Sequence, residues 1–512
     1  MKRLSIDQAH PERGPALVRK FGPEGRQCRQ GAALRMSGSM AKVARAAFLL
    51  GCVAALAGCT VGPDYVKPEA KLAPLHNAGA VASRPGTQGE IQLDRWWAGF
   101  QDPQLTRMVE RALRQNLDIQ ASLERVAQAR AVAKGAGAKL LPALDADAQA
   151  TYERMSLENP IGAIARTMPD FNRNFELYDA GLSASWETDL FGGLKRREEA
   201  ALAMAGAAEA MHAGVRISIA AEVADTYFRI RGDQEQLRVA QARIDTDTDL
   251  LAMLKEQRAH GMATDREVAQ GEALLAHAQG IVPLLRIDLE AQLNRLDVLL
   301  GAQPGTYAAE LNTAAAVPPV PRITTQFSDF LRRRPDVMAA ERNLAAANAR
   351  IGAALAGYYP EMSLAGVLGY EALTASHMFK SATFQPAAIV GLRWRLFDFG
   401  RIDAEVEQAD AATREALLHY RQVVLRAAED VENACADLVQ YEVYSQDVSR
   451  QIDALKRVRE DSQQAYKSGM IALTDVLDAD RQLLVAEGEL PRARTDAARA
   501  AVRLFRSLGG GW

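Results

Sequence analysis

The sequence predicts a mostly α-helical protein with a small β part, built from one large unit that occurs twice. Glycines recur at a constant offset of 208 residues: Gly261 is followed by Gly469, and Gly301 by Gly509. Around them, long stretches with apolar residues at helical spacing predict helices, and four shorter stretches that alternate apolar and polar residues predict strands. The repeat is too long for a solenoid, so we predict a tandem duplication.

The first 58 residues are typical of a targeting sequence. Residues 1–39 are basic, rich in Gly and Pro and without apolar periodicity, so we expect them to be disordered or to precede the true start. Residues 40–58 combine two basic residues with an apolar run, Ala46–Ala57, that is too short to span a bilayer as a stable helix. This pattern predicts a signal peptide.

The end of that segment, Leu56-Ala57-Gly58-Cys59, resembles the bacterial lipobox, in which the cysteine becomes the lipidated first residue. An ordinary signal peptide followed by an unmodified cysteine is the alternative. The next residue is Thr60 and not aspartate, which by resemblance to lipoprotein sorting rules favours the outer membrane. The other cysteine of the mature chain, Cys435, lies in a helical pattern and is predicted to be a small buried residue.

An N-terminal extension, residues 59–103, leads into the first repeat, residues 104–301. Its first helix is predicted over Gln104–Lys139, where apolar residues follow helical spacing. The period then changes to two, which predicts strands over Leu144–Tyr152 and Tyr178–Thr188.

A long helical hairpin completes each repeat. No proline occurs from Lys195 to about Arg258, and at ~1.5 Å per residue such a helix is on the order of 95 Å long. With 24% charged residues overall and no apolar run of twenty, these helices are predicted to project into an aqueous space. Pro283 and Pro491 are expected to kink or interrupt the second helix of each hairpin.

A linker, residues 302–326, precedes the second repeat, residues 327–509, and residues 510–512 form a C-terminal tail. Strands are predicted over Met362–Tyr370 and Ala388–Leu396. The remaining features of this repeat are a helix beginning near Phe327, with Pro335 and Asp336 suited to a first helical turn, and the basic run Arg332–Arg334, expected to be solvated.

The two repeats differ in length before their tryptophans. Pro142 and Pro360 are 218 residues apart, whereas Trp186 and Trp394 are 208 apart. The first repeat therefore holds ten extra residues between its proline and its tryptophan. An insertion tolerated there predicts an exposed loop.

Four strands per chain cannot close a barrel in a membrane, and an open sheet in lipid would leave backbone groups unpaired. Each predicted strand is close to the length needed to cross a bilayer on a tilt. We therefore predict that the chain oligomerises. A water-exposed four-stranded sheet capped by helices is the alternative.

The residues after Cys59, Thr60–Pro68, resemble the start of the mature NodT-type RND efflux outer-membrane lipoproteins, in the TolC-like outer membrane factor family. Trp96–Pro103, Arg334–Val337 and Leu508–Trp512 continue the resemblance, which covers the chain from about Met40. It implies a homotrimer anchored by lipid in the outer membrane of a Gram-negative cell. The trimer would form a 12-stranded β-barrel and a periplasmic α-helical barrel.

The same resemblance implies a passive exit duct of a tripartite efflux pump that exports small toxic compounds. Its partners would be a periplasmic adaptor (membrane fusion) protein and an inner-membrane RND-type transporter. A duct for type I protein secretion and a coiled-coil lipoprotein without a pore are the alternatives.

The hairpin turns are the implied adaptor contacts. They are His260-Gly261-Met262 and Ser468-Gly469-Met470, where glycine allows the left-handed backbone that a helix end often needs. The family tripeptide is usually Val-Gly-Leu, so this chain keeps the glycine and departs at both flanking positions. Turns without a binding role are the alternative.

Asp475 and Asp478, just beyond the second turn, are three residues apart and share a helix face. The resemblance assigns this pair to the periplasmic gate, where threefold symmetry would make each aspartate a ring of like charges that attracts cations. Glu267 is the first-repeat counterpart of Asp475, and Tyr466 matches a tyrosine that braces the closed gate. A solvated helix face is the alternative.

The sequence carries no recognisable catalytic motif, no phosphate-binding loop and no histidines at metal-ligand spacing. We therefore predict neither an enzyme nor a cofactor or metal site. The formal net charge is −3, and residues 1–58 hold ten Lys/Arg against three Asp/Glu, so the remaining chain is acidic. An acidic chain is unsuited to binding nucleic acid.

Overall fold

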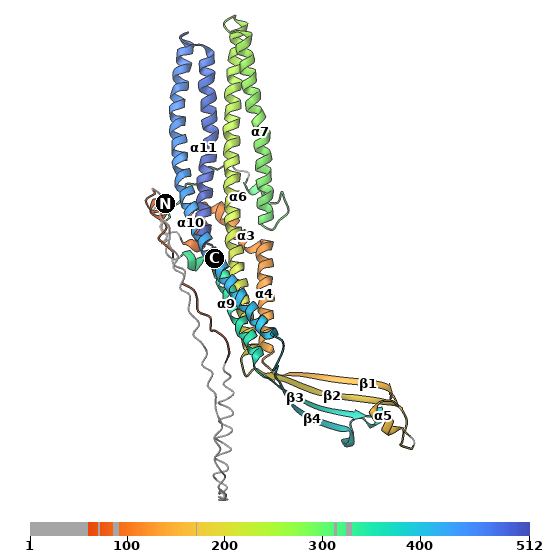
Figure 1. Cartoon of the computed structure of the whole chain (residues 1–512). Coiled ribbons are helices and arrows are strands. Elements are labelled where there is room, and N and C mark those ends of the chain that lie inside the picture. Colours follow the sequence, from red (N-terminus) through yellow and green to blue (C-terminus); the bar gives the residue numbers. More distant parts are fainter. Residues whose placement is uncertain are drawn as a thin grey trace, which may run out of the picture. The chain divides into compact units, whose positions relative to one another are not determined.

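The structure is a computed structural model that describes residues 60–69, 72–84, 92–169, 171–311, 315–323 and 330–511. The predicted signal peptide and Cys59 lie outside these residues. Within the described ranges, no helix is both long enough and apolar enough to cross a membrane. Figure 1 shows the long helices α6, α7, α10 and α11 side by side, and the sheet at the end opposite their turns.

The elements follow the predicted order of helix, strands and helical hairpin, twice. Those up to the end of the first hairpin are α2 (Ala78–Ala82), η1 (Leu93–Phe100), α3 (Pro103–Gln115), α4 (Leu117–Ala138), β1 (Ala143–Arg154), α5 (Pro160–Ala165), β2 (Asn174–Thr188), α6 (Gly193–Ala259) and α7 (Asp265–Leu299). Those that follow are η2 (Ala308–Leu311), α8 (Phe330–Arg333), α9 (Pro335–Leu355), η4 (Ala356–Tyr358), β3 (Glu361–Ala372), η5 (Ala375–His377), η6 (Ser381–Thr383), β4 (Phe384–Arg393), α10 (Arg401–Lys467) and α11 (Leu473–Ser507).

The duplication is confirmed by the helices themselves. α6 and α10 each have 67 residues, and α7 and α11 each have 35. Both long helices begin after a glycine in the left-handed region, Gly192 at φ 77° and Gly400 at φ 82°. The indole Nε1 of Trp186 donates to Leu140 O at 2.9 Å, and that of Trp394 donates to Tyr358 O at 3.0 Å. The two repeats therefore have the same local structure at the junction between strand and long helix.

The predicted helix Gln104–Lys139 is wrong as a single element, because the chain breaks at Asn116. The Asn116 side chain accepts hydrogen bonds from the backbone N–H groups of Asp118 and Ile119, which caps α4. Its amide also donates to Leu299 O at 2.9 Å from a buried position. A helix cap thus overrides an apolar periodicity that continues across it.

The four strands form one antiparallel sheet in the order β1-β2-β3-β4, so β1 and β4 are its edges. Gly181 pairs with Gly369, and Trp186 pairs with Leu364. The predicted fourth strand, Ala388–Leu396, is misplaced: β4 begins earlier and ends at Arg393. Trp394 and Leu396 therefore lie beyond the strand and are exposed.

The extra residues of the first repeat lie where an exposed loop was predicted. The connection from β1 to β2 includes the short helix α5, which the shorter connection from β3 to β4 lacks. Two isoleucines of α5, Ile161 and Ile164, are more than 60% exposed. The insertion therefore lies outside the sheet, and the pairing of β1 with β2 continues without a break from Ala143 to Arg154.

The main core lies where the middle parts of α6 and α10 and the C-terminal part of α11 meet η1 and α3. Trp96 stacks on Phe505 with ring centroids 5.2 Å apart, and Phe100 lies 4.9 Å from Phe228. All four rings are at most 2% exposed. Alanines fill much of the remaining interface, which lets long helices approach closely. Cys435 is also buried here, as predicted.

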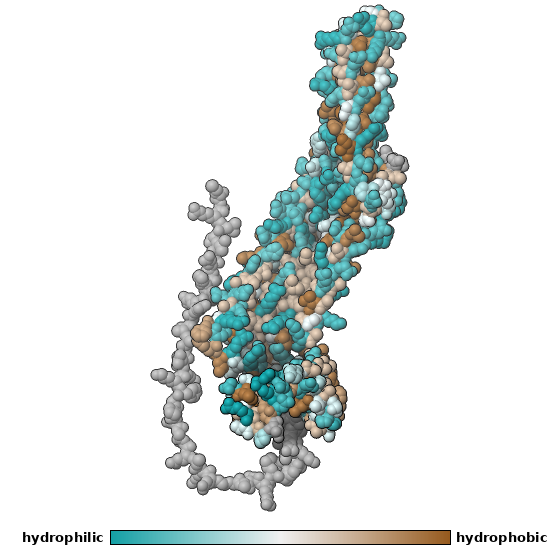
Figure 2. Space-filling model, turned by 90° about the vertical axis from the view of Figure 1, so that its right-hand side faces the viewer, coloured by the Kyte–Doolittle hydropathy of each residue, from teal (hydrophilic) through white to brown (hydrophobic). Residues whose placement is uncertain are grey.

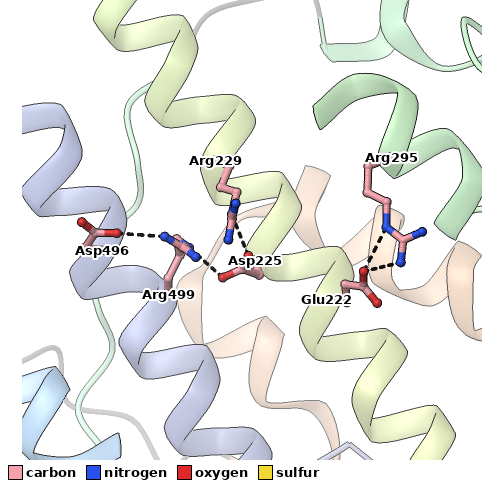
Figure 3. A network of polar contacts seen from close by, with 6 residues as sticks. All are labelled: Glu222, Asp225, Arg229, Arg295, Asp496 and Arg499. Carbon is pink, nitrogen blue, oxygen red and sulfur yellow. Dashed lines mark hydrogen bonds and ion pairs between the residues drawn. The ribbon is translucent and has the colours of Figure 1, made fainter. Parts of the chain in front are cut away.

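Ion pairs add to this core between the hairpins (Figure 3). Arg499 of α11 donates to Asp225 of α6 at 2.7 Å, and Asp225 also accepts from Arg229 at 2.9 Å. Arg295 of α7 pairs with Glu222 of α6. The first hairpin is thus linked both within itself and to the second.

The expectation of an interrupted second helix in each hairpin and that of a solvated Arg334 are both corrected. α7 and α11 continue through Pro283 and Pro491, so neither proline interrupts its helix. Arg334 is not solvated: its side chain is 11% exposed and lies 2.6 Å from Asp336 and 2.8 Å from Asp430. Its two carboxylate partners lie on α9 and α10, and only tertiary packing brings the second one near.

Candidate gate and contact surface at the hairpin tips

The two helical hairpins end in turns of the same geometry. Gly261 has φ 72° and Gly469 has φ 74°, the left-handed conformation predicted for both. The amide of Met262 donates to Gln257 O at 2.8 Å, and that of Met470 donates to Ala465 O at 2.9 Å. These bonds satisfy the last carbonyls of α6 and α10, which is why the chain reverses so tightly.

Both turns present apolar side chains to solvent. Met262 is 70% exposed and Met470 is 72% exposed, and His260 and Ser468 are exposed beside them. Figure 2 shows further apolar side chains along the helical part, interleaved with polar ones. The six turn residues therefore form two protruding surfaces available to a partner.

Glu267 is occupied by its own helix. Its carboxylate accepts from the backbone N–H of Thr264 at 2.7 Å and from the Thr264 hydroxyl at 2.8 Å, and Thr264 caps α7 in return. The hydrogen bond from the Thr264 backbone N–H is the main reason why the pKa of Glu267 is lowered. The carboxylate thus stays ionised at the start of α7.

Asp475 and Asp478 are both exposed on the first two turns of α11, as their spacing predicted. Asp475 accepts from the backbone N–H of Ala472 at 3.2 Å, and Asp478 accepts from Gln482 and Arg481, each at 2.8 Å. The hydrogen bonds from Gln482 and Arg481 lower the pKa of Asp478. The single chain therefore presents two exposed carboxylates on one face.

Tyr466 lies between the two tips. Its hydroxyl is 3.4 Å from Gln257 Oε1 of α6, and its ring packs on a small apolar cluster that includes Leu254, Leu473 and Val476. Burial raises the pKa of Tyr466, and the charge of Glu267 raises it further. The structure thus brings Tyr466 and Glu267 together, from different hairpins.

A mostly buried set of charges behind the tips was not predicted, in which only Arg459 is partly exposed. We call it the ionic joint: Arg243 and Asp247 of α6, Arg459 of α10 and Asp480 of α11. Arg459 lies 2.6 Å from Asp480, and Arg243 lies 2.8 Å from Asp247 and 3.8 Å from Asp480. Asp247 and Asp480 are at most 4% exposed. Burial raises the pKa of Asp247 against the effect of Arg243.

The sequence held one signal for this joint. Asp480 belongs to the same acidic run as Asp475 and Asp478 but falls on the opposite face of a helix, beside the apolar positions. Its arginine partners have no such signal, because they lie on other helices. Among the described residues, no three His, Cys, Asp or Glu side chains gather as a metal ion would require.

A small antiparallel sheet joined to two long helical hairpins with exposed tips defines the class of outer-membrane channel proteins. The structure superposes on the outer-membrane channel OprN with a TM-score of 0.81 at 31% identity, covering 89% of this chain and all of that one. It superposes on the open state of the Neisseria gonorrhoeae MtrE outer membrane channel with a TM-score of 0.75 at 27% identity, covering 88% and 98% of the two chains.

Sequence comparison gives the family. The model of the outer membrane efflux protein family matches residues 108–302 and 327–510, more than half of the chain. The pyoverdine export outer membrane protein OpmQ of Pseudomonas putida is 32% identical over 422 residues, which are 82% of this chain and 88% of that relative. Nodulation protein T of Rhizobium leguminosarum is 30% identical and covers 89% of this chain and 95% of its own. The chain belongs to the outer membrane efflux protein family.

Proposed function

We propose that this protein is the passive outer-membrane exit duct of a tripartite RND-type efflux pump for small toxic compounds. The observation that carries the proposal is the sheet with two free edges, continuous with helices of 67 residues. At ~1.5 Å per residue each such helix is on the order of 100 Å long, about three times the hydrocarbon core of a bilayer. The relative OpmQ, named for export of pyoverdine, supports efflux over protein secretion.

Three copies of the chain complete the duct. Within the described part of the chain, β1 and β4 each lack a partner on one side, and an unpaired edge inside lipid costs several kcal/mol per exposed backbone group. Pairing β4 of one protomer with β1 of the next removes all edges and gives a ring of twelve strands. The hairpins of the same three chains then enclose the periplasmic passage.

Partners attach at the two ends of this assembly. Acyl chains on Cys59 anchor each protomer in the outer membrane. Two chains are needed for lasting attachment, because one chain alone binds a membrane only reversibly. The exposed turns around Gly261 and Gly469 receive the tips of a periplasmic adaptor, which connects the duct to an inner-membrane RND-type transporter. The transporter supplies the energy, since the chain shows no nucleotide-binding motif.

The gate lies at the same tips. In a trimer, Asp475 and Asp478 each form a ring of three carboxylates, which attracts cations and repels anions at a constriction. Tyr466 contacts Gln257 and the small apolar cluster around Leu254, and it keeps the two hairpins together in the closed state. Glu267 supports that arrangement by capping α7.

The gate is tested by the conductance of the purified protein in a planar lipid bilayer. Asp475→Ala combined with Asp478→Ala should raise the conductance and weaken the cation preference, because both charge rings are removed. Glu415→Ala with Asp453→Ala, two exposed acids of α10 away from the turn, is the control. An unchanged conductance in the tip variant would remove the gate assignment.

A deletion strain tests the function itself. Loss of the gene should sensitise cells to small toxic compounds, and the wild-type gene should restore resistance. The protein should also co-purify with its adaptor and transporter, and His260→Asp with Ser468→Asp at the turns should weaken that association. A strain with unaltered resistance and a defect in protein secretion would favour the secretion duct instead.

A further inference from the structure

The first described residues, Thr60–Lys67, form a strap along α6 and α9. The strap begins at the end of β2, where the amide of Val61 donates to Phe191 O at 3.0 Å. Arg196 of α6 then donates to three strap acceptors: to Val61 O at 3.1 Å, to Gly62 O at 3.2 Å and to the Asp64 carboxylate at 2.8 Å. The Arg196 side chain thus binds three residues of the strap, Val61, Gly62 and Asp64.

The side chain of Arg196 is buried beneath the strap. It is 4% exposed, and its remaining guanidinium nitrogen donates to Glu199 at 2.8 Å. A buried cation is costly unless its donors are used, and two of the acceptors here are backbone carbonyls that only the strap supplies. Arginine suits this site because its planar group directs several donors at once, which lysine cannot do.

Three glycines allow the strap to lie this close. A Cβ atom on Gly62, which has φ +93°, would lie 2.4 Å from Gly352 Cα, and one on Gly352 would lie 2.7 Å from Val61 O. A Cβ atom on Gly192 would lie 2.7 Å from Thr60 Cα. Each contact is shorter than real Cβ atoms show, so any side chain at these positions displaces the strap.

Further along, side chains of α9 hold the strap. Asn348 donates to Pro63 O at 2.9 Å, and the hydroxyl of Tyr65 donates to Glu341 at 3.0 Å. Lys67 lies 3.4 Å from the same carboxylate, which is 6% exposed. The strap is therefore bound along its length and not at one point.

Among the residues that the structure describes, the second repeat has no copy of this arrangement. At the offset of 208 residues, Arg196 corresponds to Ala404 and Gly192 to Gly400. A Cβ atom on Gly400 would meet only the Asp403 carboxylate, at 3.8 Å. The strap site is thus a feature of the first repeat alone and does not follow from the shared fold.

We infer that Arg196 is a positioning residue for the lipid anchor. By binding Val61, Gly62 and Asp64, it holds the processed N-terminus where β2 leads into α6, so that the acyl chains of Cys59 enter lipid beside the sheet. This inference rests on the proposed lipidation. Without Arg196 the start of the strap keeps only single hydrogen bonds to Phe191 and Asn348, and the anchor then samples lipid over a wider range.

Hydrogen exchange on the full-length lipoprotein in detergent tests the binding of the strap. Arg196→Ala and Gly192→Ala should each speed exchange in the peptide 60–66 at least tenfold, and Arg196→Lys should give an intermediate rate. Gly400→Ala is the matched control, because it places alanine at the same φ without touching the strap. Circular dichroism verifies that each variant keeps its helices. Equal exchange in the wild type and Arg196→Ala would overturn the inference.

Growth with a photoactivatable fatty acid tests the position of the anchor. In the wild type the acyl chains should cross-link to peptides around residues 182–197, and Arg196→Ala should lower that fraction at least threefold. An unchanged cross-link map would overturn the anchoring role. An N-terminal peptide without acyl chains would refute the proposed lipidation, whereas the exchange result decides separately whether Arg196 binds the strap.

Discussion

At the scale of single residues, Asp233 shows how this fold changes an ionisation. It lies with Asp288 and Arg492 on a polar cavity of about 300 Å³ between α6, α7 and α11. The pKa of Asp233 is raised to about 6, mainly by burial and also by the charge of Asp288, and two arginines only partly oppose these effects. The folded protein therefore binds this proton more tightly than the unfolded chain does.

The sign of the resulting pH dependence follows from linkage. Between the ordinary pKa and about 6 the folded state holds more protons than the unfolded state, so stability falls as pH rises through about 6. Asp233→Asn should remove this dependence and be at least as stable as the wild type at pH 7.5. The midpoint of thermal unfolding at pH 5 and pH 7.5 measures it, with exposed Asp249→Asn as control. A wild-type pH response in Asp233→Asn would contradict the assignment.

At the scale of elements, neighbouring side chains of α11 have opposite roles. Asp478 is exposed and bonds to residues of its own helix, whereas Asp480, two residues on, is buried between Arg243 and Arg459 of two other helices. At the offset of 208 residues these arginines correspond to Gln451 and Leu251, so the ionic joint is not duplicated. The ionic joint is thus one of the places where charged side chains link the two hairpins of one chain.

Removing one member of a buried ionic group leaves the others uncompensated. Asp480→Ala should therefore destabilise the protein by about 3 kcal/mol, while Asp478→Ala should cost under about 1 kcal/mol because its pairs are exposed. The two variants form a matched pair on one helix, and thermal unfolding in detergent compares them. Equal losses of stability would show that the joint does not link the hairpins.

The cap at Asn116 gives a second test at this scale. Asn116→Ala removes two hydrogen bonds to the start of α4 and one to Leu299 O, so we expect a loss of about 1 to 2 kcal/mol. Asn116→Asp keeps the acceptor for α4 and should lose only the bond to Leu299. Hydrogen exchange at Asp118 and Ile119 distinguishes the two variants.

At the scale of the whole molecule, the proposed ring of strands assigns the two faces of β4. Val390 and Leu392 point to one face and are 70% and 67% exposed in the single chain, whereas Gln385 and Arg393 point to the other. An apolar face suits lipid and a polar face suits a water-filled passage. The exposed apolar face is thus the side that the membrane covers.

Val390→Arg should therefore impair the assembled protein, because a basic residue that faces lipid costs up to roughly 2 to 4 kcal/mol. Gln385→Arg, on the other face of the same strand, should be tolerated. The heat-resistant trimer fraction on unheated gels of outer-membrane preparations measures both. Equal tolerance would argue against a lipid-facing β4.

The sequence by itself determined the duplication, the order of the elements and the reversal of the chain at Gly261 and Gly469. These depend on local periods and on backbone conformations that few residues other than glycine adopt, so a short stretch of chain contains the information. It also carried the family resemblance and the acidic pair at the tip.

Only the tertiary structure decided which charges are buried. Arg334 was expected to be solvated, Asp480 was one of three aspartates in a run, and Arg196 had no signal at all. Each is buried by groups far away in the chain, such as Asp430 for Arg334 and the carbonyls of Val61 and Gly62 for Arg196. Burial of a charge depends on partners that only packing brings within hydrogen-bond distance, and local spacing contains no record of them.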